Sequence, residues 1–195
     1  MTNRNSLIFM SLAVFAIMSA GCITQTIRLE GRRVWPANPQ FTINPGNYSE
    51  DELRMAGIRI DGVYIRCGFR PQEVQEEYDE ALRRKGWRTG SPYIRFWANG
   101  RMLARVSDMD VLTAGEADCF EGGILGYFSF PTNAVVEGEE YSYDPGRGGG
   151  VYSKSRDVIE GDTLWSRTRA KHKGVPVELG YKFVPIKGMK AQPDW

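Results

Sequence analysis

The chain has 195 residues, which is enough for one domain with a real core but hardly for two. Its 42% hydrophobic and 12% aromatic content excludes a disordered chain, and its 22 glycines favour a β-rich fold over a helical bundle. The chain has 25 basic and 24 acidic side chains, and Arg4 lies in an N-terminal segment, residues 1–21, that we expect to be removed for the reasons given below. The remaining chain then has 24 basic and 24 acidic side chains. A nucleic-acid partner requires a basic field, so this balance argues against one.

The first 22 residues have the pattern of a targeting segment. Arg4 precedes an apolar run at 7–18, which is shorter than the roughly 20 residues needed to cross a bilayer. The run ends in Ser19-Ala20-Gly21-Cys22, which resembles the lipobox of bacterial lipoproteins. The resemblance implies that residues 1–21 are a signal peptide and that Cys22 is acylated, for example with palmitate. We therefore expect a membrane-anchored lipoprotein of the bacterial cell envelope, facing the periplasm or the cell surface. The alternative is ordinary signal-peptidase cleavage after Ala20, without a lipid.

Residues 22–55 are expected to form an N-terminal tether. Several Pro, Gly and Asn residues interrupt the segment 23–48, which has no sustained apolar period. Ser49 and Glu52 then have the spacing of a capping box, which predicts a short helix through Met55.

The remaining cysteines, Cys67 and Cys119, are an even pair if Cys22 is acylated. In an oxidising compartment such a pair predicts a disulfide bridge. Two separate thiols are the alternative, because the sequence does not show whether the two Cα atoms lie within about 7 Å.

One amphipathic helix is predicted over 71–85. Pro71 suits the first helical turn, and apolar side chains recur on one narrow face: Val74, Tyr78, Ala81 and Leu82. Because only this stripe is apolar, we expect the helix to pack on the outside of the domain. A lid or plug is the alternative.

Residues 93–107 predict a β-hairpin with a three-residue loop. A loop of Ala98, Asn99 and Gly100, with Gly100 in the left-handed region, pairs Trp97 with Arg101 and separates the two faces. The face expected toward the core carries Ile94, Phe96, Met102, Ala104 and Val106. The other face is expected to be a solvated surface on which cations rest against rings: Tyr93, Arg95, Trp97, Arg101, Leu103 and Arg105.

Six further strands are predicted from alternation and turn signals, at 58–66, 124–130, 134–141, 150–160, 163–169 and 177–185. Gly62 is expected to mark a kink or bulge, since the apolar residues change parity there. The predicted fold class is mainly β: an eight-stranded antiparallel up-and-down barrel over 56–190, with one flanking helix and a C-terminal tail at 191–195. Such a barrel is either filled by side chains or holds one small ligand.

Four segments resemble, in order, recurring stretches of small bacterial lipocalin-like (calycin-type) lipoproteins. They are 60–64 (IDGVY), 95–100 (RFWANG), 159–164 (IEGDTL) and 181–185 (YKFVP). Gly62 is followed by Val63 and Tyr64 where larger lipocalins have Gly-x-Trp, so the similarity is to a divergent calycin-type barrel. It implies a cup that binds a small apolar or amphipathic ligand.

The cup that this resemblance implies has an aromatic candidate lining: Phe96, Phe128, Trp165, Tyr181 and Phe183. Alternatively, these rings simply fill the interior. Arg167 and Arg169 share the parity of Trp165. They would hold a ligand anion if that face points inward, and are surface cations if it points outward.

No residue set has the strength of a catalytic signature. The only histidine, His172, lies in a basic loop, and Cys and His are not clustered as a zinc site requires. We therefore expect a protein that is not an enzyme and has no cofactor or metal. The leading hypothesis is a lipid-anchored, ligand-binding barrel. The alternative is a structural or interaction module that docks on another envelope protein through the barrel surface and helix 71–85.

Overall fold

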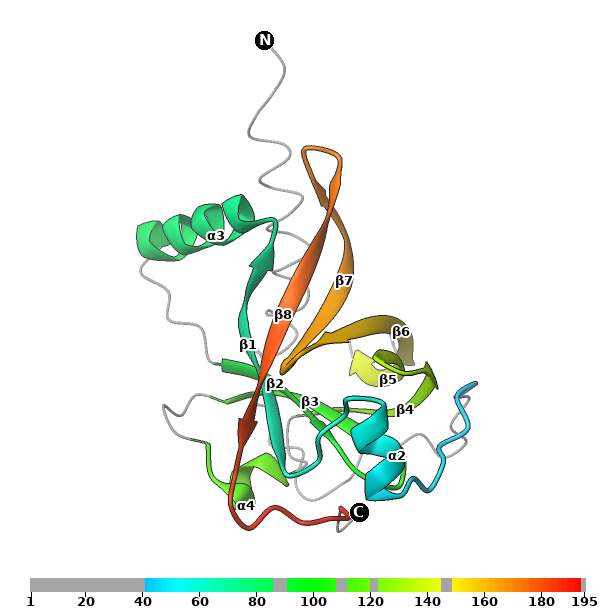
Figure 1. Ribbon diagram of the computed structural model, residues 1–195. Helices are drawn as coiled ribbons and strands as arrows, with labels where there is room; N and C mark the ends of the chain where they lie inside the picture. The colour runs from blue at the N-terminus through cyan, green and yellow to red at the C-terminus, as the bar shows by residue number, and fades with distance from the viewer. Residues whose placement is uncertain (1–40, 86–90, 108–111, 120–122, 145–148, 194–195) are drawn as a thin grey trace. The chain divides into compact units, whose positions relative to one another are not determined.

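The computed structural model describes residues 41–85, 91–107, 112–119, 123–144 and 149–193 (Figure 1). Eight strands pair in sequence order and close into a barrel, which confirms the predicted fold class. Apart from residues 143–150, the strands belong to one compact unit. Their bounds are β1 (Gly62–Arg70), β2 (Ser91–Phe96), β3 (Arg101–Ser107), β4 (Ile124–Thr132), β5 (Val135–Asp144), β6 (Gly149–Glu160), β7 (Thr163–His172) and β8 (Val175–Pro185). The predicted signal peptide, Cys22 and residues 23–40 of the tether lie outside the described residues.

The barrel closes where β1 pairs with β8, from Gly62 opposite Pro185 to Arg70 opposite Glu178. A Cβ atom on Gly62 would lie 2.1 Å from the carbonyl oxygen of Val184, so this position requires glycine for close strand approach. The bulge predicted at Gly62 is wrong. The register shift lies between Arg66 and Gly68, and β1 begins at Gly62 rather than at residue 58.

The hairpin of β2 and β3 has the predicted three-residue loop. The Trp97 amide donates to the carbonyl of Arg101 (3.0 Å), and Gly100 has a φ of 73°. Phe96 pairs with Met102 and Ile94 with Ala104, so the predicted inner face does point toward the core.

The predicted outer face of this hairpin is not solvated. Tyr93, Arg95, Trp97 and Leu103 are at most 1% exposed. The short helix α4 (Ala114–Ala117) and the segment 186–190 after β8 cover them. The expectation of a surface failed because these covering segments come from other parts of the chain, which alternation within the hairpin cannot reveal.

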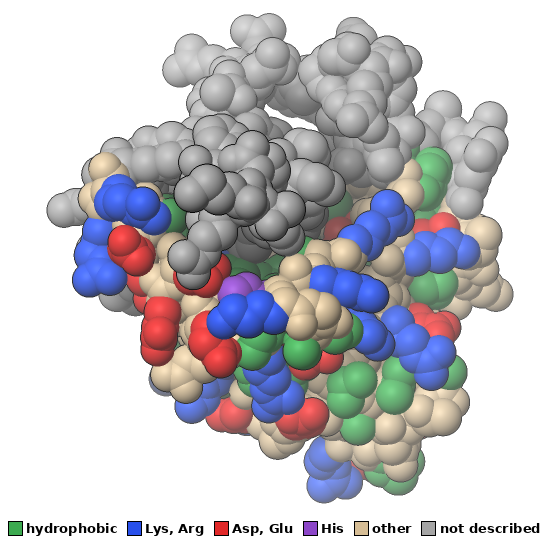
Figure 2. Space-filling model, turned by 90° about the horizontal axis from the view of Figure 1, so that it is seen from above, with side chains coloured by type: hydrophobic (Ala, Val, Ile, Leu, Met, Phe, Trp, Pro, Cys, Tyr) green, Lys and Arg blue, Asp and Glu red, His purple; other side chains and the backbone are tan. Residues whose placement is uncertain are grey.

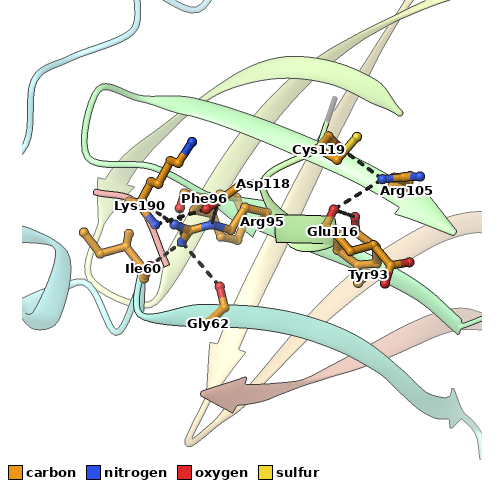
Figure 3. A network of polar contacts seen from close by, with 10 residues as sticks. All are labelled: Ile60, Gly62, Tyr93, Arg95, Phe96, Arg105, Glu116, Asp118, Cys119 and Lys190. Atoms are coloured by element: carbon orange, nitrogen blue, oxygen red, sulfur yellow. Dashed lines mark hydrogen bonds and ion pairs between the residues drawn. The ribbon is translucent and has the colours of Figure 1, made fainter. Parts of the chain in front are cut away.

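Arg95 connects these layers on the outside of the barrel (Figure 3). Its guanidinium donates to the carbonyls of Ile60, Phe96 (2.8 Å) and Lys190 (2.6 Å). Its Nε lies 3.5 Å from Oδ1 of Asp118, which follows α4. The side chain thus joins the start of β1, the end of β2 and the C-terminal segment, and its role is structural.

Helices α2 (Glu50–Met55) and α3 (Gln72–Lys85) lie at opposite ends of the barrel (Figure 1). The predicted capping box begins α2: the Glu52 amide donates to Ser49 Oγ, and the Ser49 amide donates to Glu52 Oε2 (2.7 Å). Leu53 of α2 is buried in the main core together with Ala56 and Ile58, so α2 plugs one end of the barrel.

The described part of the predicted tether, residues 41–55, packs against the barrel. The amides of Thr42 and Ile43 donate to the Glu139 carboxylate, 2.5 and 2.9 Å away. The Tyr48 amide donates to the carbonyl of Ala98 in the hairpin loop, 2.8 Å away. The folded domain therefore begins at least as early as residue 41 rather than at 56.

The predicted disulfide is absent, because both Cys67 and Cys119 are free thiols. Cys67 lies in the bulge of β1, where a Cβ atom added to Gly180 of β8 would meet its sulfur. Cys119 follows α4, and its carbonyl accepts a hydrogen bond from Arg105. Cys67 thus belongs to the barrel wall, whereas Cys119 belongs to the segment after α4. None of the helices in the described ranges is long and apolar enough to span a membrane.

Candidate ligand site inside the barrel

The end of the barrel plugged by α2 is filled with aromatic side chains. The Phe96 ring lies 4.8 Å from that of Phe128, and Tyr64 contacts both Phe96 (5.6 Å) and Phe183 (5.2 Å). These four rings are between 0% and 5% exposed. At this end, therefore, the interior is packed core.

Toward α3 the interior carries polar side chains on the side formed by β1 and β5–β8, interspersed with buried apolar ones such as Leu179, which pairs with Ser166. Strand alternation assigns these side chains to the interior: Arg66 is two residues beyond Tyr64, Asp157 two before Ile159, and Ser166 two beyond Leu164. Arg66 pairs with Tyr181 across β1 and β8, and Asp157 pairs with Ser166 across β6 and β7. Glu140 of β5 has the parity of core residue Val136. The polar wall consists of Arg66, Glu140, Asp157, Ser166 and Tyr181.

The facing side, formed by β2–β4, is apolar at the same level. Pro92 pairs with Val106, and Ala104 pairs with both Ile94 and Ile124. Since Ile94 belongs to the core, these partners point inward as well. The apolar wall consists of Pro92, Ala104, Val106 and Ile124.

Solvent reaches the interior at this level. Apart from Asp157, the members of both walls point inward and nevertheless keep some accessible surface, whereas the inward residues nearer α2 have almost none. An inward side chain can remain accessible only where neighbours do not fill the space beside it. The inward-facing side chains therefore change from tightly packed rings near α2 to partly accessible polar and apolar groups toward α3, and we call this partly accessible region the chamber.

Two carboxyl groups in the polar wall have unusual electrostatics. Burial raises the pKa of the Glu140 carboxyl to about 7, and repulsion from Asp157 adds to the increase. Burial also raises the pKa of Asp157 to about 6, although hydrogen bonds with Ser166 and Ser155 oppose the shift. Both carboxyls therefore have higher pKa values than ordinary surface carboxyls, because burial disfavours their charged forms.

Helix α3 borders the chamber next to β1. Its Tyr78 ring lies 5.1 Å from the ring of Phe69, and the Tyr78 hydroxyl accepts a hydrogen bond from Arg66 (3.3 Å). Glu77 of α3 also lies 3.8 Å from Nδ1 of His172 at the end of β7. The helix follows the predicted 71–85 span closely and packs on the barrel with part of its apolar stripe. Seen from this end, acidic and basic side chains intersperse over the described surface (Figure 2).

The predicted pocket residues fall into three groups. Phe96, Phe128 and Phe183 point inward but form the filled floor, and Tyr181 lines the chamber. Trp165 does not line it, because its neighbour Leu164 occupies the core and Trp165 faces outward. The guanidinium of Arg70 lies 3.6 Å above its ring.

Arg167 and Arg169 share that outward parity and are exposed, so the alternative of surface cations is correct.

Sequence reasoning missed the charged members of the polar wall. Strand alternation alone could have assigned Asp157 to the barrel interior, because it lies two residues from Ile159 in a strand whose inner face was identifiable. Glu140 was harder to place because the run Glu137-Gly138-Glu139-Glu140 has no apolar marker. Its assignment depends on Val136.

The described residues contain no group of three or more His, Cys, Asp or Glu side chains placed to hold a metal ion. Comparisons of the chain with protein-family models, with curated proteins and with solved structures find no match. The chamber's own chemistry is therefore the basis for the functional argument.

Proposed function

We propose that the barrel binds one small amphipathic molecule in the chamber and that the acylated Cys22 anchors the protein to a bacterial envelope membrane. The observation that carries the binding proposal is the pairing of a polar and an apolar wall above a closed floor. Such an interior suits a ligand with one polar end and a short apolar body. Eight strands enclose space for no more than one small ligand, which limits its size.

The binding proposal is tested by extracting ligand from full-length protein purified from the envelope and identifying it by mass spectrometry. We expect an amphiphile at close to one molecule per chain. Ala104→Trp places an indole in the chamber and should abolish its recovery. Arg156→Trp adds the same group on an exposed, outward-facing position of β6 and should leave it unchanged. Equal recovery from both variants would contradict a ligand in the chamber.

The anchor proposal depends on Cys22 and has a separate test. Cys22→Ser removes the thiol that would carry the acyl chains, so the protein should leave the membrane fraction and no longer incorporate labelled palmitate. Continued palmitate labelling of the variant would count against acylation at this residue.

Docking on an envelope protein through α3 is the alternative function. The apolar stripe of α3 is partly buried against its own barrel, and the described exposed positions of the helix are charged apart from Gln72. Where Figure 2 shows described residues, charged side chains lie between the apolar ones. Since stable protein interfaces usually have an apolar centre, these observations favour the ligand-binding proposal. If crosslinking from α3 repeatedly captured the same envelope protein, the docking function would be favoured instead.

A further inference from the structure

We propose that the outer end of the β7–β8 hairpin is a docking surface for the anionic headgroups of the membrane to which the protein is anchored. We call residues 167–177 the basic hairpin. Its docking surface consists of Arg167, Arg169, Lys171, Lys173 and Val175. The inference rests on the proposed lipid anchor and adds a second membrane contact, which would fix the orientation of the barrel.

The basic hairpin projects beyond its neighbouring strands (Figure 1). β8 pairs with β1 only as far as Glu178, and β7 pairs with β6 only as far as Ser166. Beyond these points the described residues of the two strands pair only with each other, as far as His172 opposite Val175. A two-stranded hairpin has open edges and little core of its own, so this segment is accessible to another surface.

The basic hairpin concentrates positive charge in a chain with nearly equal numbers of basic and acidic side chains. Between Asp162 and Glu178 the sequence has four Lys and Arg residues and no Asp or Glu. All four cations are exposed, and within the described residues none of them has an ion-pair partner. By contrast, Arg156 of β6 lies 3.4 Å from Glu137, and Lys182 of β8 lies 3.6 Å from Asp162. The four cations are therefore available to an external anion.

Two acidic side chains border the basic hairpin without cancelling its charge. Glu178 lies opposite Arg167 where the hairpin begins, and Glu77 of α3 lies 3.8 Å from Nδ1 of His172. Four cations and these two acids leave a net charge of +2 with His172 neutral. The surface thus stays attractive to anions.

The turn at the tip adds an apolar side chain in a defined position. His172 pairs with Val175, and Lys173 and Gly174 between them have φ angles of 48° and 85°. Positive φ at both central residues is typical of the type I′ turn, which closes a tight hairpin. Val175 is 53% exposed next to this turn. Segments that bind at a bilayer surface combine such an apolar group with cations, because the first enters among the headgroups that attract the second.

An anionic bilayer fits this surface better than a protein or a nucleic acid does. A stable protein interface usually has an apolar centre, whereas Val175 is the one large apolar side chain of the basic hairpin that is strongly exposed. Proteins that bind single-stranded nucleic acid stack bases on aromatic rings, and the basic hairpin has no Phe, Tyr or Trp. An anionic bilayer requires only several cations close to its surface.

The proposed anchor would keep the basic hairpin near such a surface. Phe41 lies 19 residues after Cys22, a stretch of chain that reaches roughly 65 Å at full extension. Tethering makes docking an intramolecular step, so contacts that are weak one by one suffice. The basic hairpin shares one end of the barrel with α3, which contacts His172 (Figure 1). Docking would therefore turn the accessible end of the chamber toward the bilayer, the source of an amphiphilic ligand.

The test measures hydrogen exchange in the acylated protein on lipid nanodiscs. The discs contain phosphatidylcholine alone or with roughly one third phosphatidylglycerol, which is anionic. We expect the amides of the basic hairpin to exchange at least about tenfold more slowly on the anionic discs, and this protection to disappear in roughly 0.5 M salt. Equal exchange on both kinds of disc, with the protein still attached to them, would overturn the docking surface while leaving the anchor intact. Absence of the protein from both kinds of disc would overturn the anchor and the docking surface together.

A charge-matched pair of variants locates the effect. Lys171→Gln with Lys173→Gln should weaken docking on the order of tenfold and remove most of the protection on anionic discs. The control, Arg54→Gln with Lys187→Gln, also removes two exposed cations, from α2 and from the segment after β8, and should keep the protection. Both variants should exchange like the natural chain on neutral discs, which shows that the hairpin still folds. Equal loss of protection in the two variants would assign the effect to net charge and overturn the docking surface.

A protein partner would give a different result in the same measurement. Protection that appears on neutral discs only after a lipid-free envelope extract is added, and that anionic lipid does not produce, would assign the basic hairpin to an acidic protein. That outcome would overturn the lipid surface as its occupant. Protection by anionic lipid alone, without any extract, is the expected result.

Discussion

Arg95 and Asp118 form an ion pair that is almost entirely enclosed, with side chains 0% and 8% exposed. Burial lowers the pKa of the Arg95 guanidinium, and the Asp118 charge opposes that effect. Arg95→Met should leave Asp118 without its ion-pair partner and remove the donor to several buried carbonyls. We expect a loss of about 3–5 kcal/mol in the free energy of unfolding, measured by urea denaturation. Arg54→Met should be nearly neutral, because Arg54 is 80% exposed. A loss below about 1 kcal/mol for Arg95→Met would contradict this role.

Glu139 should make the packing of residues 41–43 sensitive to acid. Burial by itself would raise the pKa of this carboxyl, but hydrogen bonds from the amides of Ile43 and Thr42 lower it below the ordinary value. Because the pKa is lower in the folded state, the ionised carboxylate stabilises the fold when the pH is above the unfolded pKa of 4.5. This contribution is lost as the pH falls through the lowered pKa of the folded state. Glu139→Gln should increase hydrogen exchange at the two amides at pH 7. Unchanged exchange would show that other contacts hold the segment.

Asp157 should have the opposite effect on stability. Its pKa is raised from 3.8 to about 6, so folding favours its protonated form. The resulting stability is present in acid and is lost as the pH rises through about 6. Without ligand, Asp157→Asn should therefore be more stable than the natural chain at pH 8 by up to about 3 kcal/mol, and similar to it at pH 4. Thermal unfolding across this range checks the prediction. A parallel pH dependence of the two proteins would exclude it.

Gly100 and Gly161 provide a matched pair of turn substitutions. Both have positive φ angles, 73° and 64°, but a Cβ atom on Gly100 would lie 2.9 Å from backbone atoms of Gly46, whereas nothing lies near one on Gly161. Gly161→Ala should cost about 1 kcal/mol, the ordinary penalty of the left-handed region. Gly100→Ala should cost clearly more, because it also displaces the N-terminal segment from the hairpin. Equal losses in urea denaturation would show that this contact is dispensable.

The two described thiols should be open to alkylation without prior reduction. Cys67 is exposed on the bulge of β1 and Cys119 is partly accessible. Burial of its sulfur raises the pKa of Cys67, so its reaction with maleimide at pH 7 should be slower than that of a free thiol. Mass spectrometry of protein alkylated under native conditions should find both residues labelled. A mass consistent with a Cys67–Cys119 bridge would contradict the structure.

Much of the architecture could be predicted because its signals are local. Alternation and turn residues located eight strands, and the Ala98-Asn99-Gly100 loop determined the register of the β2–β3 hairpin, since loop length and a left-handed glycine leave one pairing that separates the faces. The capping box of α2 and the span of α3 were predictable for the same reason. Each of these features depends on residues close together in the chain.

The tertiary structure decided which polar residues are enclosed. Arg95 alternates like a solvent-facing residue and becomes buried because α4 and residues 186–190 cover it. Trp165 was placed on the wrong side, because the parity of β7 depends on Leu164 entering a core built from distant strands. Glu140 and Asp157 are enclosed only when the barrel closes and brings β5 and β6 to face β1 and β8. The sequence therefore determined the strands and turns, whereas closure determined the chamber, because its walls combine residues that no local pattern connects.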